Sequence, residues 1–522
     1  MTCVLLRGGL VLSGALVAVC ASVAAPIPEL ERLAIYYGFP SSVNGATSNA
    51  QAIAVFDDFD VIILGAGLEL PSHPDHANTV AIIAGLPATA EVYGYIDIGV
   101  TNWRTLPDIQ SSVTLWDAMG VDGIFFDEFG YDFQVTRSRQ NTVTGYAHAA
   151  GLAAMANGYI PDDCLGSEVN PTLNTFGEAF NPAGTPTALS SAFGDGYLLE
   201  NLTVANGQWH SPSFWMWRAG RARHFADTLG VRIHAVSTSD TPVQAFIDHG
   251  HRACLMWEFD SYQHTYGNFS ATGPGAGQLD LHPWPSGFGT SWTGPRHERT
   301  NRLERETDLG LIEVHGTSGD PGSFGSSFTP GGVASEDAAY PITVGGGTAD
   351  WAALTPVFID PDESPSTPGG PDFGPVWMTN DATSLHLRFL SPDVWALDLN
   401  TRVWLDTDRD RTTGYRLDFL GADHLVEGST LYAFAGASQS DFDFSPVTAL
   451  SVAPVSGISD FEMAIPRAAL GLSAPGASLS LRLTNSASVP NDVAPDFGEG
   501  AMHTQVLTDN LVPAGISFLG AD

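Results

Sequence analysis

The sequence predicts an α/β protein in which a (β/α)8 TIM-type barrel is followed by an all-β sandwich domain. Two observations predict this order. Between residues 33 and 260, short apolar runs alternate with amphipathic or polar stretches, which is the pattern of repeated βα units. From about residue 340, short strands of alternating polarity are separated by turn residues, which is typical of an antiparallel sandwich. The length of 522 residues allows two or three domains.

Eight apolar runs are the candidate barrel strands. Runs such as Val61-Ile62-Ile63-Leu64 are apolar throughout, as expected of a parallel sheet covered by helices. An open doubly wound sheet is the alternative, but the first run lacks the glycine fingerprint of a dinucleotide-binding turn. We expect strands at Leu33–Phe39, Val61–Gly67, Glu91–Gly99, Asp122–Glu128, Leu152–Gly158, Gly196–Asn201, Val231–Thr238 and Ala253–Phe259, and helices at Ser111–Met119, Arg137–Ala150, Phe214–Leu229 and Pro242–His249.

Residues 1–25 have the order of a secretory signal peptide. Arg7 precedes an apolar run, Gly8–Val19, and small residues lead to a cleavage site after Ala25. A lipoprotein anchored through Cys20 is disfavoured, because Val19 stands where such sites want a small residue. No later stretch reaches the roughly 18 apolar residues of a membrane span. We therefore expect a secreted, extracellular protein without a membrane span.

Composition divides the rest of the chain into three parts. We assign residues 26–270 to the barrel, 271–339 to barrel closure and a Gly/Pro/Ser-rich linker, and 340–522 to the sandwich. The linker contains one strand-like run, Gly310–His315. Beyond the signal peptide only Cys164 and Cys254 remain, and the sequence leaves open whether they form a disulfide or two separate buried thiols.

The charge balance excludes several classes of function. Asp and Glu number 58 against 21 cationic residues, all of them arginine, and the formal net charge is −37. Without lysine, the chain cannot be a Schiff-base aldolase, a pyridoxal-phosphate enzyme or a Walker-type phosphate-binding protein. Nucleic acids and anionic membrane surfaces are disfavoured as partners, because they are bound by clustered cations.

Carboxylates dominate the ends of the candidate strands, where barrels of this type carry their functional side chains. Two carboxylates across a barrel mouth suit glycoside hydrolysis, in which one protonates the leaving oxygen and the other acts as nucleophile or activates water. The alternative is that these acids cap helices or pair with arginine. We predict Asp127, Glu128 and Glu200 as catalytic residues, and Tyr36, Tyr37, Asp97, Asn157, Trp257 and Glu258 as substrate-binding residues.

A family resemblance over roughly residues 33–260 rests on Ala34–Gly38, Val61–Gly65, Val92–Asp97, Gly123–Glu128, Ala156–Gly158 and Tyr197–Glu200. In this order, the segments resemble spherulin-4-like proteins, (β/α)8 glycoside hydrolases related to the endo-α-1,4-polygalactosaminidase families. The resemblance implies action on galactosamine-containing exopolysaccharides. It also implies that Asp127 and Glu128 are the family's acidic pair and that Glu200 is its second catalytic carboxylate.

The chain departs from that family in two places. Tyr95–Gly99 replaces the more usual small or hydroxyl-bearing strand ending, and a long insertion, Asp162–Asp195, precedes the sixth strand. Both departures leave the substrate open, and the sequence does not assign the acid and the nucleophile or base. We expect no metal in the barrel: His73-Pro74-Asp75-His76 is interpreted as a solvated loop. Arg218, Arg221 and Arg223 are interpreted as a solvated or ion-paired helix face.

The segment Val403–Tyr415 places Asp406, Asp408 and Asp410 at alternating positions. Hard oxygen ligands spaced in this way can hold a structural calcium ion, although the EF-hand pattern is not met and a plain polar hairpin loop is the favoured interpretation. Together with Thr348–Trp351, Gly421–His424 and Phe461–Pro466, this segment resembles carbohydrate-binding β-sandwiches of the family-nine and DOMON-like types. Four tryptophans of this region could either stack on sugars or pack in the core, and core packing is the favoured interpretation for each: Trp351, Trp377, Trp395 and Trp404.

The leading hypothesis is therefore a secreted, monomeric, endo-acting glycoside hydrolase that needs no cofactor and binds polysaccharide. A partly deacetylated galactosamine polymer is cationic and would be attracted by the acidic chain. The alternative is a non-catalytic glycan-binding surface protein on a barrel scaffold. A metal-dependent hydrolase or lyase is the weakest hypothesis, because no histidine-rich ligand set follows the strands.

Overall fold

A computed structural model describes most of the chain, including residues 26–267 of the predicted barrel. The predicted signal peptide up to residue 24, and Trp395, lie outside the described residues. The described residues are 25–267, 275–298, 302–317, 320–332, 342–352, 354, 356–360, 373–391, 401–410, 413–417, 420–454, 460–473, 477–485, 493–494 and 503–506.

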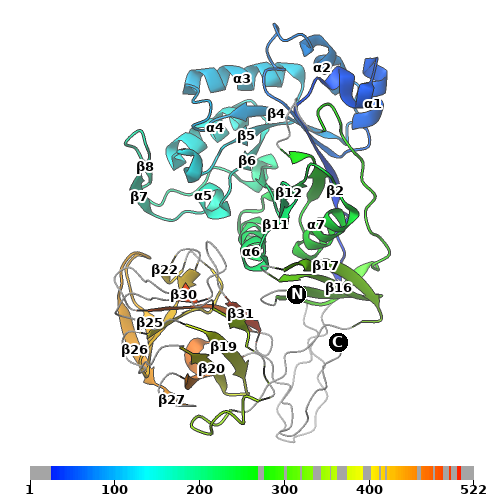
Figure 1. The fold of residues 1–522 in the computed structure, drawn as a ribbon. Coiled ribbons are helices and arrows are strands. Elements are labelled where there is room, and N and C mark those ends of the chain that lie inside the picture. Colours follow the sequence, from blue (N-terminus) through cyan, green and yellow to red (C-terminus); the bar gives the residue numbers. More distant parts are fainter. Residues whose placement is uncertain are drawn as a thin grey trace, which may run out of the picture.

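The first half of the chain forms the predicted closed barrel of eight parallel strands (Figure 1). Side chains such as Ile63, Phe125 and Leu198 fill its interior, while the alternate residues pack outward against the helices. The prediction of a (β/α)8 fold is confirmed. In barrel order the strands are β2 (Glu31–Tyr36), β3 (Val61–Leu64), β4 (Glu91–Asp97), β5 (Gly123–Asp127), β6 (Ala153–Asn157), β9 (Gly196–Leu199), β12 (Arg232–Thr238) and β13 (Ser261–Thr265).

The helices that cover the barrel begin and end at local signals. Thr105 and Thr136 accept a backbone N–H at the starts of α3 and α4, and Gly120 and Gly230 end α3 and α6 in the left-handed conformation. Cys164 and Cys254 are buried as free thiols and do not form a disulfide with each other. No helix among the described residues is long and apolar enough to span a membrane. The helices are α1 (Asn49–Phe56), α2 (His76–Ile83), α3 (Leu106–Met119), α4 (Arg137–Ala149), α5 (Pro161–Leu165), α6 (Pro212–Leu229) and α7 (Gln244–Trp257).

The eighth strand differs from the prediction. Ala253–Trp257 is the last part of α7, and the strand that closes the barrel is β13, which pairs with β12 and β2. The sequence suggested otherwise because α7 is buried on nearly all sides from Ile247 to Trp257, so that its end has the continuous apolar character of a parallel strand. Trp257 and Glu258 consequently precede the last strand instead of ending it.

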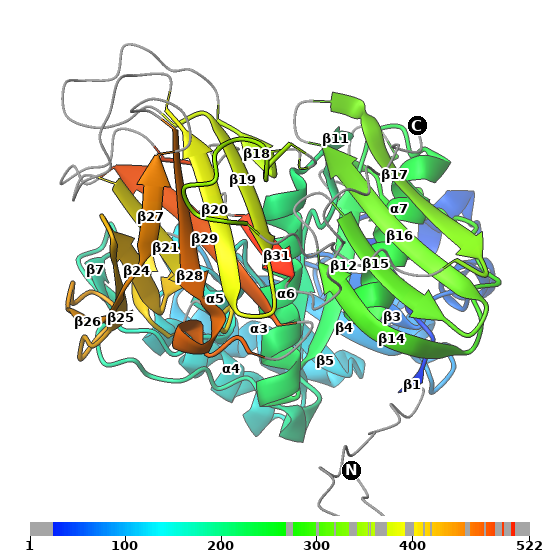
Figure 2. The same ribbon diagram turned by 90° about the horizontal axis from the view of Figure 1, so that it is seen from below.

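The predicted linker region contains a second sheet. Strands β14 (Ser291–Glu298), β15 (Arg302–Thr307), β16 (Gly310–Thr317) and β17 (Asp320–Pro330) are antiparallel, and β1 (Ala25–Pro26) pairs with β14 at one edge. Trp292, Leu303 and Ile312 belong to the same apolar cluster as the barrel's outer core. Figure 2 shows this sheet beside α7. The expectation of a linker was therefore wrong for residues 291–298, 302–317 and 320–330, which form a sheet packed on the barrel.

The last third of the described chain is the predicted β-sandwich. Val376 and Met463 of one sheet share a core with Val403 and Leu481 of the other. The strand order of the first sheet is β18 (Phe358–Ile359), β19 (Pro375–Asn380), β20 (Ser384–Leu390), β28 (Asp460–Pro466) and β27 (Ser451–Pro454). The strand order of the second sheet is β26 (Phe444–Ala449), β25 (Thr430–Phe434), β24 (His424–Glu427), β21 (Thr401–Asp406), β29 (Ser478–Asn485) and β30 (Val493–Ala494), and β31 (His503–Val506) also pairs with β29. A separate hairpin consists of β22 (Tyr415–Leu417) and β23 (Leu420–Ala422).

Two of the tryptophans considered for sugar stacking belong to this interior. Trp351 is 1% exposed and donates its indole N–H to Glu462 Oε2 at 2.6 Å. Trp404 is 3% exposed and donates to Thr484 Oγ1 at 2.9 Å. Both rings are unavailable for sugar stacking, which agrees with the favoured packing interpretation.

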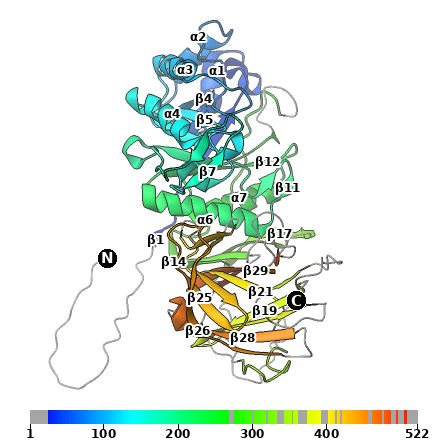
Figure 3. The same ribbon diagram turned by 90° about the vertical axis from the view of Figure 1, so that its left-hand side faces the viewer.

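Helix α6 lies between the barrel and the sandwich (Figure 3). The buried guanidinium of Arg221 bonds to Asp162 Oδ1 of α5 at 2.8 Å and to Asp410 Oδ1 of the sandwich at 2.9 Å. Trp217 packs in one apolar cluster with Trp404 and other sandwich residues. These contacts make α6 the shared wall of the two parts.

A second contact joins the barrel's long insertion to the sandwich. The insertion carries the hairpin of β7 (Asn170–Leu173) and β8 (Ala179–Asn181), and Glu168 just before it pairs with Arg416 of β22. A cavity of about 590 Å³ lies beside this ion pair, lined from the barrel by residues 167–169 and Pro171 and from the sandwich by residues 415–416 and 437–440.

The three arginines of α6 have separate roles. Arg218 and Arg221 are buried, so the solvated interpretation was wrong for them. Arg221 is ion-paired, as the other interpretation expected, and Arg223 pairs with Asp227 one turn along the helix.

Replacing Arg221 with Ala should leave the buried Asp162 carboxylate without its counter-charge and lower the free energy of unfolding by about 3–5 kcal/mol. Arg223→Ala, which removes a partly exposed ion pair and a hydrogen bond to the Glu258 carbonyl, should cost less, about 1–2 kcal/mol. Chemical denaturation of both variants measures the difference, and equal losses would show that the Arg221 pair does not stabilise the fold as inferred.

Candidate active site

Asp127 ends β5 with its carboxylate fully engaged. Its Oδ2 accepts the Tyr95 hydroxyl at 2.6 Å, and its Oδ1 accepts the Asn157 amide at 2.8 Å and the Glu128 backbone N–H at 2.9 Å. The run before it, Gly123–Phe126, is buried, which fixes the direction in which the strand emerges. Three donors suit an ionised carboxylate held in one orientation.

Glu200 directly follows β9 and is joined to Asp127 by one amide group. Asn157, the last residue of β6, donates from Nδ2 to Asp127 Oδ1 at 2.8 Å and to Glu200 Oε2 at 3.0 Å. Both oxygens lie within hydrogen-bonding distance of this one nitrogen, so they are at most 5.8 Å apart. The sequence prediction that Asp127, Asn157 and Glu200 meet at the strand ends thus describes one connected group.

Glu128 does not join this group. Its backbone has a φ of 55°, in the left-handed region, and its Oε2 accepts the N–H of Thr101 in the loop after β4 at 2.9 Å. The Glu128 side chain therefore contacts the β4–α3 loop, whereas the Asp127 side chain contacts Tyr95 and Asn157. Asn201, which follows Glu200, has a similar φ of 51°.

Asp97 ends β4 next to this loop. Its Oδ1 accepts the Gly99 N–H at 2.9 Å. Burial raises the pKa of Asp97 to about 6; the Gly99 bond opposes this effect, and the charges of Glu128 and Asp127 add to it. The structure thus brings Asp97 to the same end of the barrel as Asp127.

Tyr36, the last residue of β2, and Tyr37, which follows it, lie in different surroundings. Tyr37 packs edge-on against Tyr95 with ring centroids 5.2 Å apart. Burial raises the pKa of Tyr37, and the charges of Asp127 and Glu200 raise it further, which places its hydroxyl near both carboxylates. Tyr36 instead packs against Phe56 of α1 and donates to the Phe39 carbonyl. The structure brings Tyr37 to the site and directs Tyr36 away from it.

Trp257 and Glu258 lie elsewhere. They occupy the end of α7, which leads into the beginning of β13, so they stand at the opposite end of the barrel from the strand ends. Glu258 pairs with Arg305 of β15 at 2.9 Å, and the guanidinium of Arg296 covers the Trp257 ring. Their prediction as substrate-binding residues followed from the wrong eighth strand.

Buried arginines that the sequence did not single out for this purpose hold the backbone of the site. Arg218 of α6 donates to the carbonyls of Glu200 at 2.9 Å and Asn201 at 3.3 Å. Arg139 of α4 donates to the carbonyls of Ile98 and Arg104 in the β4–α3 loop. The multiple donors of a guanidinium can satisfy several carbonyls at once, which a lysine could not do as rigidly.

Exposed aromatic rings on the loops after the strands are a further feature that the sequence did not reveal. Trp103, after β4, stacks on Phe176 of the β7–β8 hairpin with centroids 4.3 Å apart, and Tyr159 follows β6. Such rings could contact the apolar faces of sugars. Their position in loops that follow strand ends is the signal that could have identified them.

The His73–His76 segment has a structural role. Asp75 is buried and accepts the Ser41 hydroxyl at 2.6 Å and the Asn78 amide at 2.8 Å. His76 bonds to the Leu68 carbonyl at 2.8 Å. These contacts fasten the loop before α2.

Comparisons with known proteins give no family assignment. No family model matches the chain, and no curated protein matches it. Solved structures that resemble it include the glycoside hydrolase domain of PelA from Pseudomonas aeruginosa, at 12% identity, covering 47% of this chain and 96% of that one with a TM-score of 0.29. Another is Aspergillus fumigatus Ega3 in complex with galactosamine, at 13% identity, 48% and 94% coverage and a TM-score of 0.28. An oxaloacetate acetylhydrolase resembles the chain at 14% identity, 46% and 76% coverage and a TM-score of 0.27.

Asp97 generates a pH-dependent stability. Because the folded state binds its proton more tightly than the unfolded chain, stability should fall as the pH rises from about 4 to about 6. Asp97→Asn, which keeps an oxygen for the Gly99 N–H, should be more stable than the wild type by on the order of 1 kcal/mol at pH 7 and no more stable at pH 4. Thermal unfolding across this range measures the effect. The exposed Asp117→Asn is the control, and a gain that does not depend on pH would contradict the assignment.

Proposed function

We propose that the barrel is a glycoside hydrolase in which Asp127 and Glu200 are the two reacting carboxylates. The observation that carries this proposal is the Asn157 amide, which holds one oxygen of each carboxylate within 5.8 Å of the other. Retaining glycosidases have their two carboxyl groups roughly 5–5.5 Å apart, whereas inverting enzymes leave more room for a water molecule. The spacing favours a retaining double displacement.

The surroundings assign the two roles. Burial raises the pKa of Glu200; the Asn157 hydrogen bond opposes this effect and the charge of Asp127 adds to it. A carboxyl that keeps its proton suits the general acid. Asp127, with its three donors, suits the ionised nucleophile.

The reaction then has two balanced steps. Asp127 forms a bond to the anomeric carbon while the glycosidic C–O bond breaks and the Glu200 proton passes to the leaving oxygen. In the second step, water gives a proton to Glu200 and its oxygen displaces Asp127 from the sugar. Asn157 and Tyr95 hold Asp127 in place throughout.

For the substrate, we propose a microbial exopolysaccharide that contains galactosamine. This rests on the sequence resemblance to spherulin-4-like and polygalactosaminidase-related proteins, and on the net charge of −37, which would attract a partly deacetylated, cationic polymer. Trp103, Tyr159 and Phe176 are partly exposed on the loops beyond the strand ends and could contact sugars there. Arg139 nevertheless covers one part of the Trp103 ring, and Arg218 covers one part of the Tyr159 ring.

Glu200→Gln and Asp127→Asn should each lower the release of reducing ends from a partly deacetylated galactosamine polymer at least about 100-fold, because each removes one reacting carboxylate. Glu258→Gln is the matched control, since Glu258 lies at the other end of the barrel, and it should keep wild-type activity. Reducing-end release and product mass spectrometry on purified proteins make the measurement.

Two further measurements separate this proposal from its rivals. Wild-type activity should fall as the pH rises through the raised pKa of Glu200, and the first product detected by NMR should keep the anomeric configuration of the substrate. Full activity of Glu200→Gln would refute the roles assigned here. Binding without cleavage of any exopolysaccharide tested would favour the non-catalytic glycan-binding alternative.

We further propose that the chain is exported and cleaved after Ala25. Such a cut would leave the pairing of Pro26 with Ser291 available to the mature protein. The mature N-terminus should therefore be Pro26 when the secreted protein is analysed by mass spectrometry, and an intact residue 1–25 segment on exported protein would contradict the proposal.

A further inference from the structure

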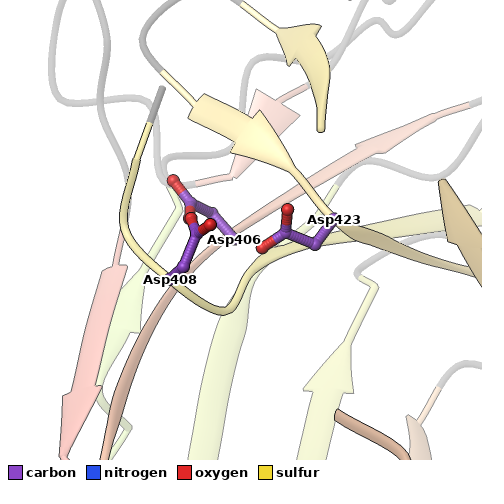
Figure 4. A group of neighbouring side chains, drawn as sticks. All are labelled: Asp406, Asp408 and Asp423. Atoms are coloured by element: carbon purple, nitrogen blue, oxygen red, sulfur yellow. The ribbon is translucent and has the colours of Figure 1, made fainter. Parts of the chain in front are cut away.

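Three aspartates gather on one edge of the sandwich. Asp406 ends β21, Asp408 lies in the turn that follows, and Asp423 stands between β23 and β24. One carboxylate oxygen from each lies within 4.8 Å of the others, and Figure 4 shows the three side chains converging. The group differs from the set expected from sequence, because Asp423 belongs to it and Asp410 does not.

Asp410 is engaged elsewhere. Its carboxylate binds Arg221 at 2.9 Å and lies 3.5 Å from His224 Nε2, both on α6 of the barrel. The alternating spacing of Asp406, Asp408 and Asp410 predicts one shared site, but the turn directs the third aspartate to the other side of the loop. Asp423 takes its place from a strand end 13 or more residues away in sequence.

Asp406 supplies the observation that points to a ligand. The residue is 3% exposed, and its Oδ1 is buried without a hydrogen-bond partner among the described residues. Within the same part of the chain, its other oxygen has one long contact, 3.4 Å, with the Gly421 N–H. A buried carboxylate oxygen without a donor is costly, and a cation placed among the three aspartates would compensate it.

The other two carboxylates are positioned by donors of the same turn. Asp423 Oδ2 accepts the Thr407 N–H at 2.9 Å and its hydroxyl at 2.8 Å. Asp408 Oδ1 accepts the Asp410 N–H at 2.9 Å, and the Thr413 hydroxyl lies 3.0 Å from both Asp408 oxygens. The turn itself is thus built so that both side chains face Asp406.

Charge crowding supports the same conclusion. One carboxylate oxygen from each of the three aspartates lies within 4.8 Å of the others. Carboxylates at this separation repel one another when ionised, and a divalent cation among them would remove the repulsion.

We propose that Asp406, Asp408 and Asp423 bind a calcium ion. The donors are all carboxylate oxygens, the ligands that hard divalent cations prefer, and oxygens on opposite sides of a calcium ion are about 4.8 Å apart at a Ca–O distance of about 2.4 Å. The ion would fix the turn that carries Asp410 against Arg221. Calcium binding would therefore strengthen the contact between sandwich and barrel, independently of the hydrolase proposal.

Calorimetry on the full chain, stripped with a chelator and titrated with CaCl2, tests the site. The wild type should bind one more calcium per chain than Asp406→Asn and should show a calcium-dependent rise in melting temperature that this variant lacks. Asp410→Asn is the matched control: it removes a negative charge from the same turn and should keep the calcium-dependent rise, although its starting stability is lower.

The outcomes are decisive in both directions. Without calcium, Asp406→Asn should melt no lower than the wild type, because the substitution removes a crowded carboxylate whose one hydrogen bond within the described residues is long. Should Asp406→Asn fail to fold, the exposed Asp408→Asn carries the same test. Equal calcium binding by wild type and these variants, loss of the calcium effect in Asp410→Asn alone, or an equal response to MgCl2 would overturn the proposal.

Discussion

The arrangement of this molecule depends on a single buried guanidinium. Arg221 is almost fully enclosed, and an enclosed charge is tolerated only when its counter-charges are in place. One of them, Asp162, comes from the insertion after β6, and the other, Asp410, comes from the sandwich. Three segments that are distant in sequence must therefore be correctly placed together before this group is satisfied, which makes the domain contact cooperative with the barrel's own loops.

The same helix carries that requirement to the candidate active site. Arg218 stands one turn before Arg221 on α6 and holds the carbonyl of Glu200. The backbone of Glu200, one of the two proposed reacting carboxylates, is thus held by the helix that also forms the wall against the sandwich. On the other side, Asn157 fixes the distance from Glu200 to Asp127. The site is held by polar groups on rigid elements, as catalysis by pre-organised groups demands.

The sequence predicted what strand geometry determines. Asp127, Asn157 and Glu200 could be placed together because each ends an apolar strand and parallel strands meet at one edge of a barrel. The sequence prediction failed for the eighth strand. Helix α7 is buried between the barrel and the β14–β17 sheet, so the apolar end of this helix resembled a buried strand. The true strand, β13, has the polar sequence Ser-Tyr-Gln-His-Thr and was not recognised. Contacts such as Asp406 with Asp423 depend on strand pairing and have no local signal.

Each of the two proposed reacting carboxylates is followed by a residue in the left-handed conformation, Glu128 after Asp127 and Asn201 after Glu200. Asparagine tolerates this backbone better than glutamate, so Glu128 is the position where more conformational energy is stored. The left-handed residues after Asp127 and Glu200 turn the chain sharply at this end of the barrel, at a cost in the stability of the fold. Replacing Glu128 with glycine would relieve this backbone strain and raise thermal stability. The same substitution would remove the side chain that binds this turn to the loop after β4. A gain in thermal stability at residue 128 would therefore be accompanied by the loss of the contact between this turn and the β4–α3 loop.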